Sequence, residues 1–114
     1  MSEEATLQRP LQPYAYVQDV AGDWETYGQA AQRLGDIPPD GMIVRFAGTT
    51  SVGFRVIEVW DSREAWEAFR DDCLRPTMRA VGGDGSDVES SFRDMTVEHA
   101  IFNPARIRQL TRAR

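Results

Sequence analysis

One segment limits the possible folds more than any other: residues 54–60, FRVIEVW, which have the composition of a β-strand. Side chains alternate between the two faces of a strand. The apolar residues of this segment therefore fall on both faces, and they are Phe54, Val56 and Trp60 on one side and Ile57 and Val59 on the other. An antiparallel strand that is apolar on both faces is expected to be buried on both. The segment predicts a sheet that is covered on two sides.

The neighbouring segments predict a β-α-β-β-α-β order of elements. Strands are expected at residues 14–20, 42–48, 54–60 and 95–103, and helices at 24–34 and 62–81. This order is that of the ferredoxin-like α+β fold, in which both helices lie on one face of a single antiparallel sheet. The other face then needs a cover of its own, and a second copy of the same sheet is the simplest candidate. The sequence thus predicts a homodimer with two sheets face to face.

Single residues predict where the helices begin and where one of them breaks. Asp23 is expected to cap the first helix, and Asp61, with Glu64 three residues later, is expected to cap the second. Pro76 has no amide proton, so it should kink or divide the second helix near Arg75.

The chain is expected to hold one domain with a loose segment at each end. Residues 1–12 are interpreted as a flexible arm, residues 13–104 as the α+β domain, and residues 105–114 as a basic tail that is either solvated or binds a partner. The glycine-rich stretch 82–91 is expected to be a mobile loop or a lid. Cys73 lies in the apolar stripe of the second helix and is expected to be buried and inert.

Composition argues against several classes of function. The net charge of −5 at pH 7 is unlike that of proteins that bind nucleic acid. No apolar run approaches the roughly 20 residues of a membrane span, and the N-terminus lacks the apolar centre of a signal peptide. A single cysteine fits a reducing cytoplasm, and one histidine with one cysteine gives no ligand spacing for a metal such as zinc. We expect a cytoplasmic protein without a metal site.

Three stretches, PPDGMIVRFAG, GFRVIEVWDSREAWEAF and LRPTMRAVG, resemble proteins of the dimeric α+β barrel superfamily, close to its antibiotic biosynthesis monooxygenase-like group. The resemblance covers residues 12–103. It implies a homodimer with a ligand cavity in each subunit, between the sheet and the helices. Members of this superfamily oxidise quinol-like polyketides without metal or flavin, degrade haem, cyclise polyketides, or have no known activity. The resemblance therefore implies that an enzyme of this kind would need no cofactor.

Two titratable side chains are candidates for catalysis. His99 is predicted in mid-strand, either as a general base or as a hydrogen-bonded residue of the core or the dimer interface. Glu58 stands between apolar neighbours, so it is either paired, with Arg45 across the hairpin as the first candidate, or a functional carboxylate. Strand spacing places His99 and Glu58 roughly 10 Å apart, on either side of the first strand. Tyr16, Gln18 or a flat ligand could bridge that gap.

Aromatic side chains are expected to gather where the helices meet the sheet, as core or as the lining of a pocket for a planar ligand. The predicted catalytic residues are His99, Glu58 and Tyr16, and the predicted substrate-binding residues are Trp60, Trp66, Trp24, Arg45 and Phe69. Two functions stay open. One is a cofactor-independent monooxygenase or cyclase of secondary metabolism, in which His99 removes a phenolic proton and Tyr16 or an arginine stabilises the oxyanion. The other is a non-catalytic barrel that binds a hydrophobic metabolite.

Overall fold

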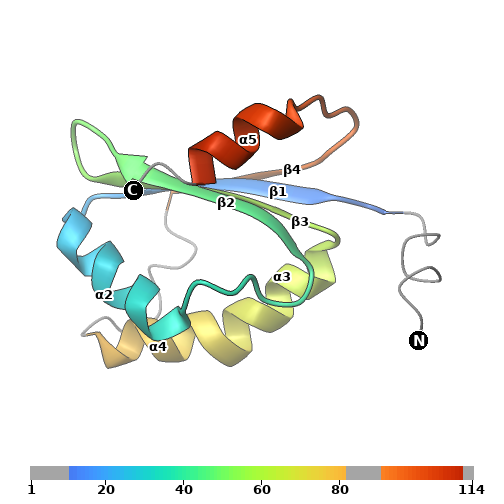
Figure 1. Cartoon of the computed structure of the whole chain (residues 1–114). Coiled ribbons are helices and arrows are strands. Elements are labelled where there is room, and N and C mark those ends of the chain that lie inside the picture. The colour runs from blue at the N-terminus through green and yellow to red at the C-terminus, as the bar shows by residue number, and fades with distance from the viewer. Residues whose placement is uncertain (1–10, 82–90, 112–114) are drawn as a thin grey trace.

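The computed structural model describes residues 11–81 and 91–111. Along the chain these residues form β1 (Tyr14–Val20), α2 (Trp24–Leu34), β2 (Met42–Thr49), β3 (Phe54–Trp60), α3 (Arg63–Phe69), the π-helical turn η1 (Arg70–Leu74), α4 (Arg75–Ala80), β4 (Phe92–Thr96) and α5 (Pro104–Thr111). The strands form one antiparallel sheet in the order β2-β3-β1-β4. Helices α2, α3 and α4 cover one face of it (Figure 1). The predicted ferredoxin-like α+β fold is confirmed.

The two faces of the sheet differ in what covers them. On the helix side, Val56 and Trp60 of β3 are buried. On the opposite side, which we call the outer face, Ile57 is 39% exposed and α5 is the element that lies nearest in the view (Figure 1). The apolar side chains that the strand registers place on the outer face are Ala15, Val17, Val44, Phe46, Ile57, Val59 and Met95. The sheet therefore carries an apolar surface on the side away from α2, α3 and α4.

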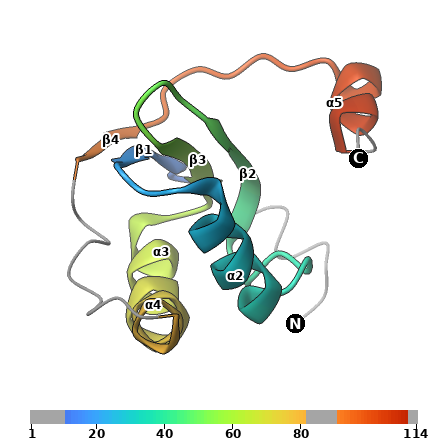
Figure 2. The ribbon, with the colours of Figure 1, turned by 90° about the vertical axis from the view of Figure 1, so that its left-hand side faces the viewer.

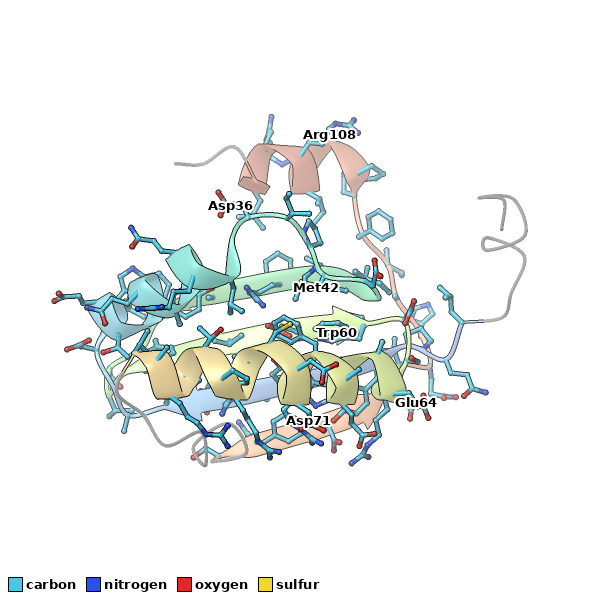
Figure 3. The ribbon with its side chains drawn as sticks, turned by 90° about the horizontal axis from the view of Figure 1, so that it is seen from below. Asp36, Met42, Trp60, Glu64, Asp71 and Arg108 are labelled. Atoms are coloured by element: carbon cyan, nitrogen blue, oxygen red, sulfur yellow. The ribbon has the colours of Figure 1, made fainter. Side chains whose placement is uncertain are left out.

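The core on the helix side is aromatic. Trp60 and Trp66 are almost completely buried and pack with Tyr14, Tyr16 and Phe69. Figure 3 views the molecule from the helix side, where Trp60 and Met42 lie together between the sheet and the helices. Burial of these five aromatic side chains contributes a large share of the hydrophobic stabilisation of a domain of this size, because each removes about 150–250 Å² from water.

The second predicted helix changes its hydrogen-bond pattern next to Pro76, at the predicted place near Arg75, but the chain stays helical from α3 through η1 into α4. Leu74 and Arg75 keep right-handed helical dihedrals, and Pro76, which has no amide proton to donate, stands just after the π-helical turn. The π-turn inserts one extra residue into the helical repeat. Leu74 and Met78 therefore pack against the core, while Cys73 is exposed. The prediction that Cys73 is buried was wrong, because the apolar stripe was drawn with an uninterrupted α-helical period.

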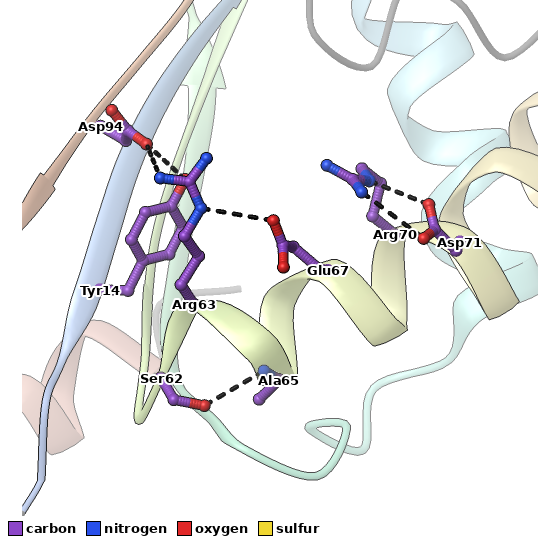
Figure 4. A network of polar contacts seen from close by, with 8 residues as sticks. All are labelled: Tyr14, Ser62, Arg63, Ala65, Glu67, Arg70, Asp71 and Asp94. Atoms are coloured by element: carbon purple, nitrogen blue, oxygen red, sulfur yellow. Dashed lines mark hydrogen bonds and ion pairs between the residues drawn. The ribbon is translucent and has the colours of Figure 1, made fainter.

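Each of the first two helix starts has a side-chain cap. Asp23 accepts a hydrogen bond from the Thr26 amide at 2.9 Å, as predicted. At the start of α3 the cap is Ser62, whose hydroxyl oxygen accepts from the Ala65 amide at 3.1 Å (Figure 4). The prediction that Asp61 caps this helix was wrong by one residue.

We expect Ser62→Ala to lower the free energy of unfolding by about 1 kcal/mol, because the Ala65 amide loses its acceptor at the helix start. Asp61→Ala is the matched control at the neighbouring position and should change stability less. Urea unfolding of the two variants measures the difference, and an equal loss in both would contradict the assignment of the cap.

The C-terminal part of the chain departs most from the predictions. The last strand is β4, at Phe92–Thr96, and the segment predicted as a strand, 95–103, is for the most part an extended stretch that leaves the sheet. β4 pairs with β1 so that Asp94, not His99, stands opposite Tyr16. The charged sequence FRDMT does not have the composition that predicts a strand, but a strand at the edge of a sheet tolerates such charges. The lid predicted at 82–91 falls almost entirely on residues 82–90, which lie outside the described residues, as do residues 1–10 of the predicted arm.

Helix α5 occupies the region predicted as a basic tail. Asn103 caps it, accepting hydrogen bonds from the amides of Ala105 at 3.1 Å and Arg106 at 3.3 Å, and Pro104 is its first residue. Pro104 was interpreted as the end of a strand, but an asparagine followed by proline is also the start signal of a helix. No helix in the described segments is long and apolar enough to cross a membrane.

Candidate functional site

A cavity of about 360 Å³ lies between the sheet and helices α2 and α4. On the sheet side its wall includes Tyr16, Gln18, Arg45, Phe54, Val56 and Glu58. On the helix side its wall includes Tyr27, Ala30, Leu34, Leu74, Met78 and Val81. The helix wall is apolar apart from Thr26 and the Tyr27 hydroxyl, whereas the sheet wall brings two charged groups into the cavity. This volume is at the lower end of the range of small-molecule sites.

The polar part of the cavity is an ion pair between two neighbouring strands. Arg45 on β2 and Glu58 on β3 are direct cross-strand partners. The Arg45 Nε donates to Glu58 Oε2 at 2.6 Å, and the two side chains are 20% and 3% exposed. The predicted pairing of Glu58 with Arg45 is therefore confirmed, and the pair faces the cavity between sheet and helices.

A β-bulge in β2 aims Arg45 at this cavity. Met42 pairs with Trp60 and Val44 pairs with Val59, so β2 holds one extra residue between them, Ile43. Without the bulge, strict alternation would turn Val44 inward and Arg45 toward the outer face. The bulge thus sends Met42 into the core and Arg45 into the cavity from the same strand. The hairpin alone predicts that Arg45 pairs with Glu58, but Arg45 faces the cavity together with Met42 in the core only because of the bulge.

Glu58 receives two further hydrogen bonds. The Trp60 indole Nε1 donates to Glu58 Oε1 at 2.8 Å, and the Tyr16 hydroxyl also donates to this carboxylate. Burial, followed by the charge of Glu58 and this hydrogen bond, strongly raises the pKa of Tyr16, so Tyr16 stays a neutral phenol. Three donors on a carboxylate that is almost unexposed hold it in one orientation.

Arg45 is the member of this group that is free to meet a ligand. Burial works against its charge, but the adjacent Glu58 carboxylate outweighs that effect and raises the pKa of Arg45. Its Nε is used by Glu58, and among the described residues no hydrogen bond from its two terminal nitrogens is found. A guanidinium carries five N–H donors in a rigid plane. Arg45 is therefore a fixed cation, and its remaining N–H groups can donate hydrogen bonds to an oxygen of a molecule in the cavity.

The predicted site residues divide into three groups. Tyr16, Arg45 and Glu58 line the cavity. Trp60, Trp66 and Phe69 belong to the aromatic core beside it. Trp24 is 43% exposed and stacks at 4.7 Å on Tyr27, which does line the cavity. The predicted set leaves out Gln18 and Tyr27, although alternation along β1 already puts Gln18 on the face of Tyr16.

His99 does not reach this cavity within its own chain. It lies in the exposed stretch after β4, beyond the Val97 amide, which donates to the Pro13 carbonyl at 2.9 Å. Its predicted place in mid-strand was wrong, because β4 pairs with β1 through earlier residues. The structure therefore does not bring His99 together with Glu58 and Tyr16.

A second polar network lies at the other end of the helix side (Figure 4). The Tyr14 hydroxyl donates to Asp94 at 2.7 Å, and Arg63 of α3 lies 3.6 Å from the same carboxylate oxygen and 5.4 Å from the centre of the Tyr14 ring. Arg63 also pairs with Glu67 at 3.3 Å. Burial and then Asp94 raise the pKa of Tyr14. These contacts tie α3 to β1 and β4, which is a structural role. In residues 11–81 and 91–111, no cluster of His, Cys, Asp and Glu could hold a metal ion.

The fold and cavity define a small α+β domain with an internal, mostly apolar pocket. No family model matches the chain, and no curated protein matches it in sequence. Among solved structures, it is similar to the crystal structure of a monooxygenase, ActVA-Orf6 of Streptomyces coelicolor, in complex with nanaomycin D. The TM-score is 0.46 and the identity 18%, over 82% of this chain and 93% of that one. This similarity concerns the fold alone.

Proposed function

We propose that this chain binds a flat aromatic or polyketide-like molecule in the cavity between sheet and helices and oxidises it as a cofactor-independent monooxygenase. The observation that carries the proposal is Arg45, the one cation among the described residues that line this mostly apolar cavity, with N–H donors left beyond its ion pair with Glu58. Such a cavity favours a ligand with a large apolar body and one acidic oxygen. A phenol or an enol of a fused ring system has this chemistry.

Arg45 supports the reaction by favouring the anionic form of the ligand. A cation at hydrogen-bond distance lowers the pKa of a phenol or enol, typically by one unit or more. A substrate whose own hydroxyl is acidic can then lose its proton to solvent, so the cavity needs no protein base for this step. This matters because Tyr16 stays neutral and Glu58 already accepts three hydrogen bonds.

The oxidation itself balances without a redox cofactor. In its keto form the substrate carries two hydrogens on the reacting ring carbon, and ionisation removes one of them as a proton. The anion adds molecular oxygen at that carbon and takes up a proton to give a hydroperoxide, which loses water. One oxygen atom becomes the new carbonyl oxygen and the other leaves as water, so the substrate supplies all the electrons. The protein holds the anion and keeps the apolar rings out of water, and Arg45 stabilises the charge on oxygen through the reaction.

A second candidate, binding without catalysis, is favoured by one observation. Among the described residues that line the cavity, the titratable groups other than Arg45 are Glu58, which is fully hydrogen-bonded, and the phenols Tyr16 and Tyr27. A ligand that is less acidic than a phenol would find no base here. In that case the protein would hold the molecule rather than oxidise it.

Native mass spectrometry with a panel of hydroxylated fused-ring aromatics, followed by oxygen-uptake measurement with each compound that binds, tests the proposal. We expect one compound to bind per chain and to be oxidised faster with the protein than alone, with one oxygen atom incorporated. Binding with an unchanged rate of oxygen uptake would favour the non-catalytic function. The absence of binding for phenolic and non-phenolic compounds alike would contradict both.

A further inference from the structure

The helical segment formed by η1 and α4 contains two sets of side chains that could face the cavity, and the two sets are offset by one residue. One set is large and apolar: Leu74, Met78 and Val81. The other is smaller and partly polar: Cys73, Thr77 and Ala80. Each set has the spacing that lies along one side of an α-helix. If the helix continued without interruption from Trp66 and Phe69, the smaller set would face the cavity, because Cys73 stands four residues after Phe69.

In the structure the larger set faces the cavity. Leu74, Met78 and Val81 line it, and Leu74 and Met78 also pack against the aromatic core. Cys73 is exposed, and the described residues that line the cavity do not include Cys73 or Thr77. Figure 2 shows α3 and α4 in line with each other, with α2 beside them on the same side of the sheet. The inward side of α4 is therefore one wall of the cavity.

The π-helical turn η1 determines which set faces inward. In this turn the Arg75 amide donates to the Arg70 carbonyl, five residues earlier, whereas an α-helix would use the carbonyl four residues earlier. The extra residue rotates the following helix by about 100° relative to α3. Pro76 favours the turn, because in an uninterrupted α-helix its ring would clash with the Asp72 carbonyl, which would also have no amide to accept from.

The choice of the larger set makes the cavity smaller. On the opposite wall α2 contributes the small residues Ala30 and Ala31, so the width between the two helices depends on Leu74 and Met78. With Cys73 and the residues in line with it in their place, the same fold would enclose more space. The observed volume of about 360 Å³ is at the lower end of the range of small-molecule sites.

We propose that η1 makes the cavity selective for small fused-ring ligands, and that Leu74 and Met78 are the residues that limit ligand size. Their side chains touch the ligand and leave room for two fused rings but not for four. In an apolar pocket, a misfit of a single methylene group already changes affinity by about tenfold or more. The inference rests on the proposed binding of a hydroxylated aromatic molecule, and it adds the size class of that molecule and the residues that determine it.

Equilibrium binding of 1-naphthol and of 1-hydroxypyrene, a phenol with four fused rings, tests the proposal. The wild-type chain should bind 1-naphthol about tenfold more tightly or better, although the larger phenol is more apolar. Met78→Ala should change the ratio of the two dissociation constants by about tenfold or more in favour of 1-hydroxypyrene. The matched control is Thr77→Ala, one position earlier on the same helix, and it should leave the ratio unchanged.

Three outcomes would overturn the proposal. If both phenols bound equally to the wild-type chain, or if Thr77→Ala changed the ratio and Met78→Ala did not, the inference alone would fail. If neither phenol bound to the wild-type chain, the proposed function would fail and the inference with it. These results are therefore distinguishable in one set of measurements.

Thiol reactivity gives a second test, which applies even if Met78→Ala does not fold. Cys73 is the only cysteine of the chain, so each variant below reports on one side chain. The wild-type thiol should react with dithiobis(nitrobenzoic acid) as an exposed thiol does, with or without 1-naphthol. The thiol of Leu74→Cys/Cys73→Ala should react about tenfold more slowly or less, and 1-naphthol should slow it further. A thiol at position 74 that reacts as fast as the wild-type thiol, or that 1-naphthol does not slow, would overturn the proposal.

Discussion

Arg45→Met is expected to lower the free energy of unfolding by about 3 kcal/mol at neutral pH, because it removes one partner of a buried ion pair. The Glu58 carboxylate is 3% exposed and would be left without its nearest cation. The hydrogen bonds from Trp60 and Tyr16 cannot replace that charge. Urea unfolding followed by tryptophan fluorescence measures the loss.

The matched control is Arg45→Gln/Glu58→Gln. It removes both charges, and two amides can hydrogen-bond each other across the strands, while the amide oxygen at position 58 can still accept from Trp60. We expect this double variant to be more stable than Arg45→Met. If the single variant were as stable as the wild-type chain, the pair would not be the buried electrostatic unit described above.

If two copies of the chain pack through their outer faces, as the sequence predicts, Ile57→Asp is expected to separate them. In a single chain, Ile57 is 39% exposed, so an aspartate there can keep much of its hydration. Between two packed outer faces the same carboxylate would be buried without a partner, which costs several kcal/mol. Sedimentation should then give the mass of one chain. Val52→Asp, at the exposed tip of the β2–β3 hairpin, is the control and should leave the dimer intact.

A dimer that persists in Ile57→Asp, with an unchanged dissociation constant, would show that the outer face is not the interface.

The sequence was sufficient for the elements whose apolar period is uninterrupted. β1 and β3 have the predicted bounds, and α2 begins at the predicted cap. β4 was misplaced because its sequence is polar and its register is decided by pairing with β1, which lies far away along the chain. The prediction placed His99 within this strand. Because the strand ends at Thr96, the proposed base lies outside the site.

Local irregularities account for the other differences. Because of the π-turn η1, Leu74 packs against the core and Cys73 is exposed. No single residue predicts such an insertion, although Pro76 indicates that the regular helix is interrupted nearby. The β-bulge at Ile43 likewise has no recognisable signal in the sequence. The pair of Arg45 and Glu58 was still predicted, because a buried carboxylate needs a cation and the hairpin offered one.

The cavity could be predicted only as a consequence of the fold. Its walls come from α2, the sheet and the end of α4, and its volume depends on the stagger between helices, which apolar periodicity does not determine. The aromatic residues were expected either in a pocket or in the core, and Trp60, Trp66 and Phe69 prove to be core. The smaller Ala30 and Ala31 of α2 leave the space that the cavity occupies.

The central claim, that the cavity receives an aromatic anion on Arg45, is tested most directly by equilibrium binding of 4-nitro-1-naphthol across the pH range in which its hydroxyl ionises. The account predicts that the wild-type chain binds the anion about tenfold more tightly than the neutral phenol or better, since a hydrogen bond to a charged group contributes about 1.5–3 kcal/mol. Arg45→Gln/Glu58→Gln should bind both forms equally. Equal affinity for both forms in the wild-type chain, or the same preference in the double variant, would contradict the claim.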